Sequence, residues 1–403
     1  MRLRRTTICL EGWYYLLVLA MVGAGAMLGE INLLLVLAGM LAGPVLFGWR
    51  SSVRATDGLE VRRKAPQGIC AGDLLVTNVR LSNLRRRRGG WALVVEEEIR
   101  RESGPSSPGE RAAGGKAAGE EPIRPRVLFP YVAAGESRIG VYRGRLARRG
   151  RYRLGPLRLS TRFPFGLFCR SITLDEIETL TVFPRLGQLT RAWAARRQEA
   201  FAGEHRRERH QGADGDFYGV REWRVGDSRR WIHWRTSARL GRPVVRQFEQ
   251  PRHRDLAVLV DLWQPPSPGE SDLENVELAV SFAATVVADL CRKGGSNLHL
   301  GAGGLSPQWI TGPASAALLQ EAMQGLALAE ACSKDGLAVL LLQAFGRVAA
   351  GTEIVLITTR AVDLADRSRF AAIWADPARR SAAARMQCID ASSEELTRFF
   401  RPD

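Results

Sequence analysis

The sequence predicts an α+β multidomain protein: a transmembrane helical hairpin, then a β-sandwich of immunoglobulin-like kind, then an α/β doubly wound domain. Three observations support this fold class: two apolar runs near the N-terminus, a region of short alternating segments, and a second half where strand and helix patterns alternate. With 403 residues and 45% hydrophobic content, the chain exceeds what one core normally organises and has apolar material for two. The predicted divisions are the hairpin at 1–55, the sandwich at 56–191, a linker with an Arg- and Trp-rich segment at 192–254, and the α/β domain at 255–403.

Two apolar runs near the N-terminus extend from Trp13 to Leu28 and from Ile31 to Phe47. At 1.5 Å per residue, roughly 17 residues make about 25 Å, near the lower limit for a ~30 Å hydrocarbon core. We therefore expect residues 13–49 to cross the lipid bilayer twice as a tight hairpin. The alternative is a cleaved signal peptide, which is disfavoured because no A-x-A-like site ends the first run and a second run follows at once.

Basic residues flank the two runs on the side of both chain ends. They are Arg2, Arg4, Arg5, Arg50 and Arg54. The positive-inside bias places such residues in the cytoplasm, so we expect two spans in the inner (plasma) membrane with both termini and the soluble domains cytoplasmic. Six cysteines without a CxxC motif or a short framework of spacings agree with a reducing compartment.

Between Gly58 and about Arg191, short segments alternate apolar and polar residues and are separated by Gly, Pro, Asn and Arg. This period of two, without a long run of period 3.6, predicts the antiparallel sandwich. Residues 103–125 are rich in Gly, Pro, Ser, Ala and Glu, with hardly any large apolar side chain. That stretch cannot offset its ordering entropy, so we expect a mobile loop between strands.

The formal net charge is +16, and arginine dominates it. Such a charge is typical of binding to nucleic acid or to an anionic membrane surface, and it also follows from a coding bias that substitutes Arg for Lys. Arginine is spread along most of the soluble part, and no single basic helix or arm gathers it. We therefore expect no nucleic-acid partner, and interpret the basic residues as a solvated or membrane-facing surface.

The second half of the chain alternates strand and helix signals. The apolar run from Asp255 to Asp261 is bracketed by charges, as in a central parallel strand covered on both faces. A capping box of Ser271 and Glu274 opens a helix that ends at Gly294. Further alternation of this kind predicts an open doubly wound sheet, in which sites form beyond the carboxyl ends of the strands.

Residues 217–249, called the signature segment below, interleave Trp and Arg around a single aspartate, Asp227. Trp is largely buried on average and Arg rarely is unless paired, so the mixture predicts a seam where guanidinium groups meet carboxylates and stack on rings. The spacing fits a strand in which Ile232 and Trp234 alternate with polar residues. It equally fits a helix with Trp231 and Trp234 at i and i+3.

At these residues the chain resembles the bacterial family called domain of unknown function 58. The positions that match its pattern are Arg221, Gly226, Asp227, Arg230, Ile232, Trp234, Ser237, Ala238 and Arg239. Trp223, Val225 and His233 depart from it, so no special role is carried onto these three. The resemblance implies a membrane-anchored protein with a degraded von Willebrand A-like domain that works beside a MoxR-type AAA ATPase. It implies no established reaction.

In von Willebrand A domains a divalent cation is held by an Asp-x-Ser-x-Ser loop after the first strand, and hard oxygen ligands are required. This chain supplies Asp261, but Trp263 and Pro265 stand where the serines would be. Thr359 is followed by Arg360 on a later loop, and an arginine there opposes a cation. We expect no cofactor, with Asp261 as the one remaining candidate ligand for Mg²⁺.

No P-loop, nucleophile elbow or HExxH helix occurs, and we assign no catalytic residues. The sequence therefore favours a non-enzymatic membrane scaffold or adaptor that docks a MoxR-type AAA ATPase or another protein. Two alternatives stay open: a metal-dependent, adhesion-type binding module, and an enzyme acting on cell-envelope precursors. The residues expected to bind the partner or to join the domains are Arg221, Gly226, Asp227, Arg230, Ile232, Trp234, Ser237 and Arg239.

Overall fold

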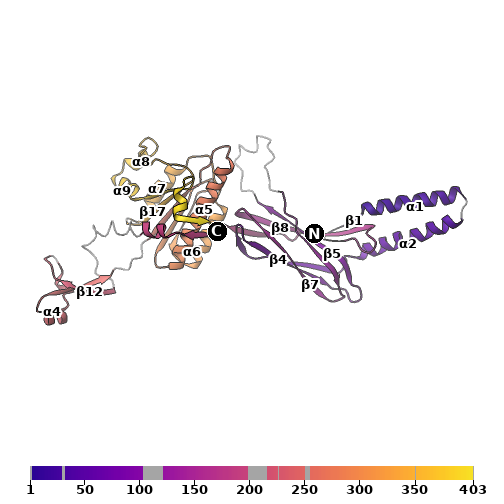
Figure 1. The fold of residues 1–403 in the computed structure, drawn as a ribbon, viewed down its shortest axis with the longest axis horizontal. Helices are drawn as coiled ribbons and strands as arrows, with labels where there is room; N and C mark the ends of the chain where they lie inside the picture. The colour runs from indigo at the N-terminus through magenta and orange to yellow at the C-terminus, as the bar shows by residue number, and fades with distance from the viewer. Residues whose placement is uncertain are drawn as a thin grey trace. The chain divides into compact units, whose positions relative to one another are not determined.

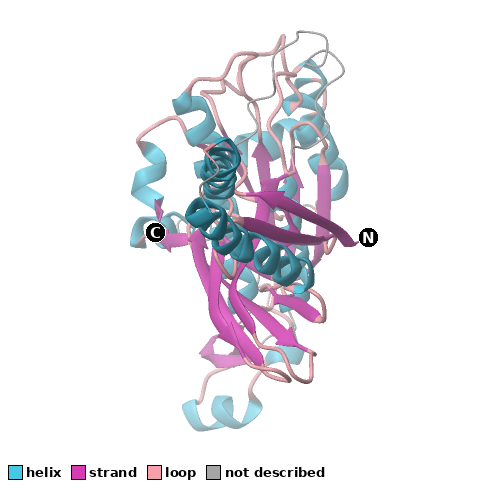
Figure 2. Ribbon diagram, turned by 90° about the vertical axis from the view of Figure 1, so that its right-hand side faces the viewer, coloured by secondary structure: helices cyan, strands magenta, loops and turns pink. Residues whose placement is uncertain are grey.

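The computed structural model describes residues 2–29, 32–102, 121–197, 216–225, 227–249, 255–349 and 351–402. They form two compact units, Met1–Arg185 and Leu186–Asp403 (Figure 1). Each unit contains both helices and strands, so the mixed α+β class is confirmed (Figure 2). Most of the loop predicted at 103–125 lies outside the described residues, and so does Gly226 of the signature segment.

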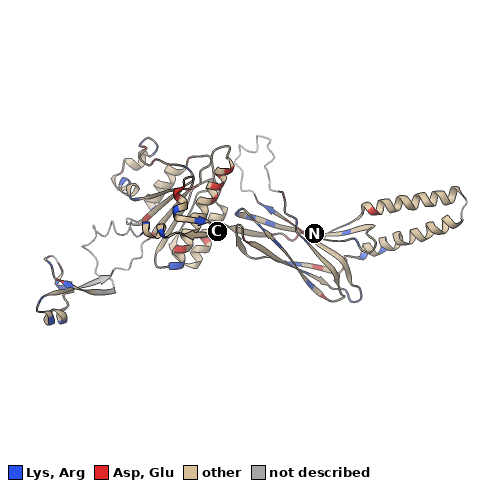
Figure 3. Ribbon diagram, in the orientation of Figure 1, with Lys and Arg blue, Asp and Glu red and all other residues tan. Residues whose placement is uncertain are grey.

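Two apolar helices open the first unit, α1 (Leu10–Leu28) and α2 (Asn32–Arg54). Both are long and apolar enough to cross a membrane, which confirms the prediction of two helices of this kind. They contact each other, and the Tyr15 hydroxyl donates a hydrogen bond to the Leu41 carbonyl oxygen at 3.0 Å. Among their described residues, charges lie only near the ends that join the sheets (Figure 3). Both helices extend past the predicted apolar runs because flanking residues such as Arg50 are themselves good helix formers.

A strand that the sequence does not predict precedes the first helix. β1 (Arg2–Ile8) pairs antiparallel with β9 (Phe168–Leu174), so the N-terminal basic residues lie in a paired strand and not in a free tail. The chain passes directly from β1 into α1, and the Cys9 amide donates to the Leu167 carbonyl oxygen at 2.9 Å. Gly12 allows this close approach, since a Cβ there would lie 2.3 Å from the same oxygen.

Two sheets make up the rest of the first unit. One runs in the order β1-β9-β8-β10-β3, with β5 paired to β8 and to β6, and the other runs β2-β4-β7. The bounds are β2 (Leu59–Lys64), β3 (Gly68–Cys70), β4 (Leu74–Asn83), β5 (Gly90–Arg101), β6 (Arg126–Val132), β7 (Ser137–Arg145), β8 (Gly150–Thr161) and β10 (Glu178–Phe183). Inward residues of both sheets, among them Leu81, Val95 and Leu154, form one core. The immunoglobulin-like kind of this sandwich stays a prediction.

The second unit is built on a five-stranded sheet in the order β16-β15-β14-β17-β18. β14 (Leu256–Asp261) lies at its centre, parallel to both neighbours and buried along its whole length, as expected of a central strand. α7 (Leu337–Arg347) shares a core with Ala257 and Leu259. α5 (Glu270–Lys293) contacts β14 and β17 without joining that core, so helices lie on both faces of the sheet. The other elements are β15 (Asn297–Ala302), β16 (Gln308–Pro313), α6 (Ala316–Leu328), β17 (Glu353–Thr358), β18 (Gln387–Asp390) and α10 (Glu395–Phe399).

Three details of this unit differ from the sequence pattern. β16 is an antiparallel edge strand that the sequence does not predict. The sequence pattern favours helix over most of Leu364 to Arg385, but the structure forms two short helices there, α8 (Ala371–Trp374) and α9 (Pro377–Arg385), because Pro377 fits the first turn of a helix and not its interior. α5 begins with Asp272 accepting a hydrogen bond from the Gly269 amide at 2.9 Å, in place of the expected Ser and Glu pair.

The second unit begins a few residues before the predicted boundary at 191. β11 (Gly187–Leu189) pairs antiparallel with β19 (Phe400–Pro402) at the end of the chain, and residues 191–197 are helical. Trp193 in this helical stretch is 2% exposed. A stretch that the sequence assigns partly to a linker therefore belongs to the packed core of this unit.

Candidate functional site

Asp261 lies at the carboxyl end of the central strand β14, where the sequence predicts a ligand position. Its side chain is 5% exposed, and Oδ2 has no hydrogen-bond partner among the described residues. The nearest cation is the guanidinium of Arg360, whose Nη2 lies 3.8 Å from Oδ2. Arg360 follows β17, the neighbouring parallel strand, so the two side chains meet at one edge of the sheet.

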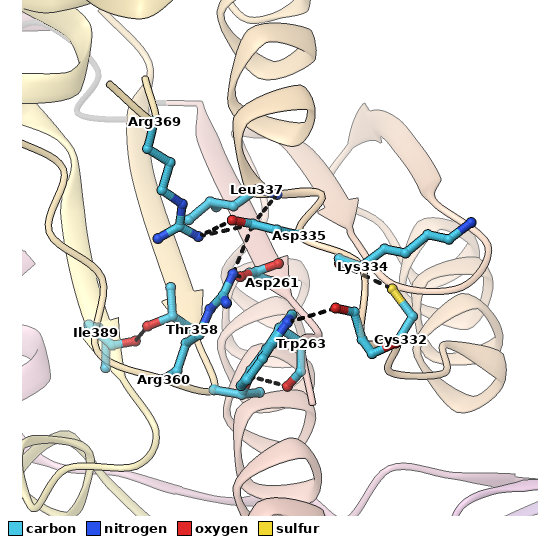
Figure 4. A network of polar contacts seen from close by, with 12 residues as sticks. Asp261, Trp263, Cys332, Lys334, Asp335, Leu337, Thr358, Arg360, Arg369 and Ile389 are labelled. Atoms are coloured by element: carbon cyan, nitrogen blue, oxygen red, sulfur yellow. Dashed lines mark hydrogen bonds and ion pairs between the residues drawn. The ribbon is translucent and has the colours of Figure 1, made fainter. Parts of the chain in front are cut away.

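Asp335 supplies the stronger acceptor for this arginine (Figure 4). Arg360 Nη2 donates to Asp335 Oδ1 at 2.8 Å, and Arg369 Nη2 lies 2.8 Å from Asp335 Oδ2. The Leu337 amide at the start of α7 donates to the same carboxylate at 3.3 Å. The half-exposed carboxylate of Asp335 thus binds both Arg360 and Arg369 near the buried Asp261.

Burial raises the pKa of Asp261 to about 6, because the charged form is poorly solvated. The nearby Arg360 lowers the pKa, and Asp335 raises it, so the ion pair at 3.8 Å does not offset burial. Asp335 behaves in the opposite way: hydrogen bonding to Arg369 and the charge of Arg360 lower its pKa despite partial burial.

The loop after β14 is fixed by hydrogen bonds of its own. Thr359 Oγ1 donates to the Trp263 carbonyl oxygen at 2.5 Å, and Trp263 Nε1 donates to the Ser333 carbonyl oxygen at 3.1 Å. The Arg360 guanidinium carbon lies 4.2 Å from the centre of the Trp263 ring, a cation–π arrangement. The Thr359 hydroxyl and the Trp263 ring therefore hold this loop in place.

These residues do not fit a divalent cation. Mg²⁺ and Ca²⁺ require several oxygen ligands around one point, whereas Asp261 faces a guanidinium group. Within the described residues, no group of three or more His, Cys, Asp or Glu side chains could hold a metal ion. At this edge of the sheet the positive charge comes from Arg360, whereas in a cation-binding loop it comes from the metal ion.

Replacement of Asp261 by asparagine is expected to remove a pH-dependent destabilisation of the folded chain. A carboxyl whose folded pKa is near 6, against an ordinary 3.8, contributes stability that is present below pH 4 and lost as the pH rises through 6. Two pKa units correspond to about 3 kcal/mol. Between pH 4 and pH 7, the unfolding free energy of Asp261→Asn should therefore rise relative to that of the wild type by up to this amount. Urea unfolding at the two pH values measures the change.

Asp335→Asn is the matched control for this change, because it neutralises the other carboxylate of the same network. The pKa of Asp335 is lower in the folded chain than its ordinary value. Asp335 therefore contributes stability that is present above the ordinary pKa and is lost at lower pH. The variant should therefore lose stability at pH 7, and its difference from the wild type should shrink as the pH falls below the ordinary carboxyl pKa. A pH-independent difference between Asp261→Asn and the wild type would contradict the assigned burial of the charge.

The signature segment folds into a small local module. β12 (Asp216–Glu222) pairs antiparallel with β13 (Val244–Glu249), and a 3₁₀ turn (Arg229–Trp231) and α4 (Trp234–Leu240) lie between them. Of the two alternatives that the spacing allows, the helical one is observed around Trp234. Gly241 ends the helix with φ of +64°, a conformation that favours glycine.

Arg221 and Asp227 form the central ion pair of this module. Arg221 Nη1 and Nη2 each donate to one oxygen of Asp227 at 2.6 Å, and the Arg224 amide donates to Oδ2 at 2.9 Å. These hydrogen bonds, with that of Arg221 first, lower the pKa of Asp227 to about 2. The carboxylate fixes the turn by joining β12 to the residues that follow it.

Ser237 and His233 close the other side of the module. The Val244 amide donates to Ser237 Oγ at 2.9 Å, and the His233 amide donates to the Val244 carbonyl oxygen at 2.8 Å. His233 Nδ1 accepts from the Thr236 amide at 3.2 Å and so caps α4. Ile232 forms a bridge with Val245. His233, which departs from the family pattern, thus has a structural role here.

The remaining signature side chains point away from these contacts. Trp234 is 71% exposed, and Arg230 and Arg239 are exposed as well. The structure therefore separates the predicted set into residues that hold the module together, such as Arg221, Asp227 and Ser237, and residues on its surface. The role of either group in joining the domains stays a prediction.

Sequence reasoning missed Asp335 and Arg369 at the Asp261 site. Asp335 precedes α7 and Arg369 precedes α8, and neither position carries a motif. The available signal is the order of elements: residues after parallel strands and before the next helices gather at one edge of an α/β sheet. An acidic residue at the start of a helix on that edge is consequently a candidate partner for Arg360.

The fold and these two sites define a two-unit α+β protein that contains a pair of membrane-length helices, an Arg- and Trp-rich module and an α/β sheet. Residues 219–311 match the family described as protein of unknown function DUF58. The family resemblance predicted from the signature segment is thereby confirmed. The matched region begins in the module and continues through β14 and α5 into β16.

No curated protein matches the chain. Solved structures with partial likeness include the CARDB domain of a Pyrococcus furiosus protein, at 12% identity and TM-score 0.18, covering 31% of this chain and 86% of that one. A superoxide reductase from Ignicoccus hospitalis has 13% identity and TM-score 0.19, with 30% and 79% covered. Spo0M from Bacillus subtilis has 10% identity and TM-score 0.18, with 36% and 55% covered. These scores are too low to assign a shared fold to the whole chain.

Proposed function

We propose that this chain is a non-enzymatic scaffold, anchored in the inner membrane by α1 and α2, that docks a MoxR-type AAA ATPase through its signature segment. Both termini and both soluble parts lie in the cytoplasm, as an immunoglobulin-like sandwich and a von Willebrand A-like domain. The observation that carries the proposal is a module held by its own hydrogen bonds that exposes Arg230, Trp234 and Arg239, called the docking surface below. Arg and Trp are enriched in the residues that contribute most to protein binding.

The Asp261 site supports docking without a metal. In an adhesion-type module a partner carboxylate completes the coordination of the cation, which requires an open ligand position. Here Arg360 lies over Trp263 and is bound to Asp335, so positive charge is supplied by the chain itself. A partner that contacts this edge would meet a guanidinium group held in a fixed orientation.

The docking surface is tested by replacing its exposed arginines. Arg230→Ala with Arg239→Ala should weaken binding of the purified AAA ATPase from the same organism to the detergent-solubilised chain. Truncation of one central arginine costs about 2 kcal/mol, so we expect a loss of roughly 30-fold or more in affinity. Surface plasmon resonance on the full chain measures the change.

Arg224→Ala with Arg235→Ala is the matched control, because these exposed arginines lie in the same module outside the matched pattern. This pair should bind within about threefold of the wild type, since rim charges contribute little. Equal losses in both pairs would point to general charge attraction, and absence of binding by the wild type would refute the proposed partner.

A further inference from the structure

A pocket of about 430 Å³ lies in the first unit, where the last turns of α2 approach the loop before β5. This volume is within the roughly 300–1,000 Å³ of small-molecule sites. Its wall is basic and aromatic and contains no acidic residue. The lining residues that carry the argument are Arg50, Arg54, Arg85, Arg88, Trp91 and Phe163.

One wall of the pocket is a single face of α2. Phe47, Arg50, Ser51 and Arg54 all line it, and their spacing of three and four residues places them side by side on the helix. Arg50 and Arg54 are exposed, and neither forms an ion pair within the described part of the chain. Two guanidinium groups one turn apart are therefore available to an anion.

Arg85 lines the pocket and is held in place by hydrogen bonds to backbone groups. Its Nε donates to the Asp57 carbonyl oxygen and its Nη2 to the Ala55 carbonyl oxygen. Nη1 has no partner among the described residues. Burial lowers the pKa of Arg85; the charge of Asp57 raises this pKa, and the charge of Arg88 lowers it.

Asn83 fixes the loop that carries Arg85 and Arg88. The buried Asn83 side chain donates to the carbonyl oxygen of Arg88 at 2.8 Å and to that of Val132 at 3.2 Å, and its Oδ1 accepts from the Arg85 amide at 3.2 Å. A buried amide thus holds the backbone of both loop arginines before any ligand binds, which lowers the entropy cost of ordering the loop on binding.

Three aromatic side chains, Phe47, Trp91 and Phe163, line part of the pocket. Trp91 stacks on Phe163 with ring centres 5.7 Å apart, and Phe47 contacts Phe165 at 6.1 Å. All four are at least 40% exposed although they belong to a packed domain. Ala92 adopts φ of +48°, and the alternation of β5 is interrupted there, so that Trp91 and Ala92 are both exposed.

We propose that this pocket binds the phosphate group of an anionic membrane lipid. Arginine forms paired hydrogen bonds with phosphate oxygens, and aromatic residues prefer the level of lipid headgroups. The position of the pocket favours a lipid over a soluble phosphate. Arg50 and Arg54 lie at the end of a helix long enough to cross a bilayer, so their guanidinium groups lie at the depth of the lipid headgroups. The inference rests on the proposed membrane anchoring.

The test is lipid retention by the full chain in a nonionic detergent, measured by native mass spectrometry against equal amounts of phosphatidylglycerol and phosphatidylcholine. The wild type should retain phosphatidylglycerol preferentially. Arg50→Gln with Arg88→Gln should reduce this preference by about tenfold, since each basic residue near a headgroup contributes to binding. Arg86→Gln with Arg87→Gln removes the same charge from exposed arginines of the same loop that do not line the pocket, and should retain the preference.

Ser51→Glu provides a second variant that keeps every arginine and adds a carboxylate to the pocket. It should abolish the preference while leaving thermal unfolding unchanged. Equal losses in the pocket pair and the loop pair would overturn the proposal in favour of diffuse charge. Displacement of the lipid by millimolar glycerol 3-phosphate or inorganic phosphate would also overturn it, because the ligand would then be a soluble phosphate.

Carbonate extraction of the membranes before solubilisation separates this inference from the proposed function. A chain released by carbonate would refute both the anchor and the lipid site. A chain that stays in the membrane but retains both lipids equally would refute the lipid site alone.

Discussion

Replacement of Glu97 by alanine is expected to lower the free energy of unfolding of the first unit by about 3–5 kcal/mol. Glu97 of β5 pairs with Arg63 of β2, and both side chains are 1% exposed. The Tyr142 hydroxyl of β7 donates to Glu97 Oε2 at 2.5 Å. Because β2 and β7 belong to one sheet and β5 to the other, this carboxylate joins the two sheets inside their shared core.

The loss is large because the change removes the acceptor of one buried group, Tyr142, and leaves buried Arg63 with only the half-exposed Glu178 as a partner. Arg63 would keep its charge in the core, and Tyr142 would lose its acceptor. Glu178→Ala is the matched control: Glu178 also pairs with Arg63, at 3.1 Å, but its side chain is 54% exposed. That change should cost no more than about 1 kcal/mol. Urea unfolding of the detergent-solubilised chain compares them, and equal effects would refute the assigned role of Glu97.

The parts of the fold that could be predicted are those whose pattern is local. The apolar runs of α1 and α2, the buried strand ending at Asp261 and the helix ended by Gly294 each follow from neighbouring residues. β1 could not be predicted in this way, because its pairing with β9 joins residues far apart in the sequence. The inward direction of Glu97 follows the alternation of β5, but its partner Arg63 lies in the opposite sheet, and no local period reveals that pairing.

The candidate site shows the same division between local and distant information. Asp261 at the end of a strand, and Arg360 as a group that opposes a cation, can both be proposed from the sequence. Asp335 fixes the position of Arg360 by a hydrogen bond. It lies in the loop before α7, and only the order of the strands in the sheet brings it close to Arg360. Arg221 and Asp227, in contrast, lie six residues apart in one short segment, so a contact between them is compatible with the local sequence alone.

Replacement of Trp193 by alanine is expected to lower the free energy of unfolding of the second unit by about 3–5 kcal/mol, the usual cost of removing a large buried aromatic side chain. Trp193 is 2% exposed, and its ring packs edge-on against Phe282 of α5 at 5.3 Å and near Phe399 of α10 at 6.2 Å. The truncation would leave a cavity between residues 191–197 and these two rings. Urea unfolding of the full chain, followed by far-UV circular dichroism, measures the loss.

Trp234→Ala is the matched control, because it removes the same side chain from a position that is 71% exposed. It should change the unfolding free energy by no more than about 0.5 kcal/mol. If Trp234 belongs to the docking surface, the same variant should nevertheless weaken AAA ATPase binding, whereas Trp193→Ala should weaken it only under conditions that unfold the second unit. Equal stability losses from the two variants would show that residues 191–197 do not belong to the core of that unit.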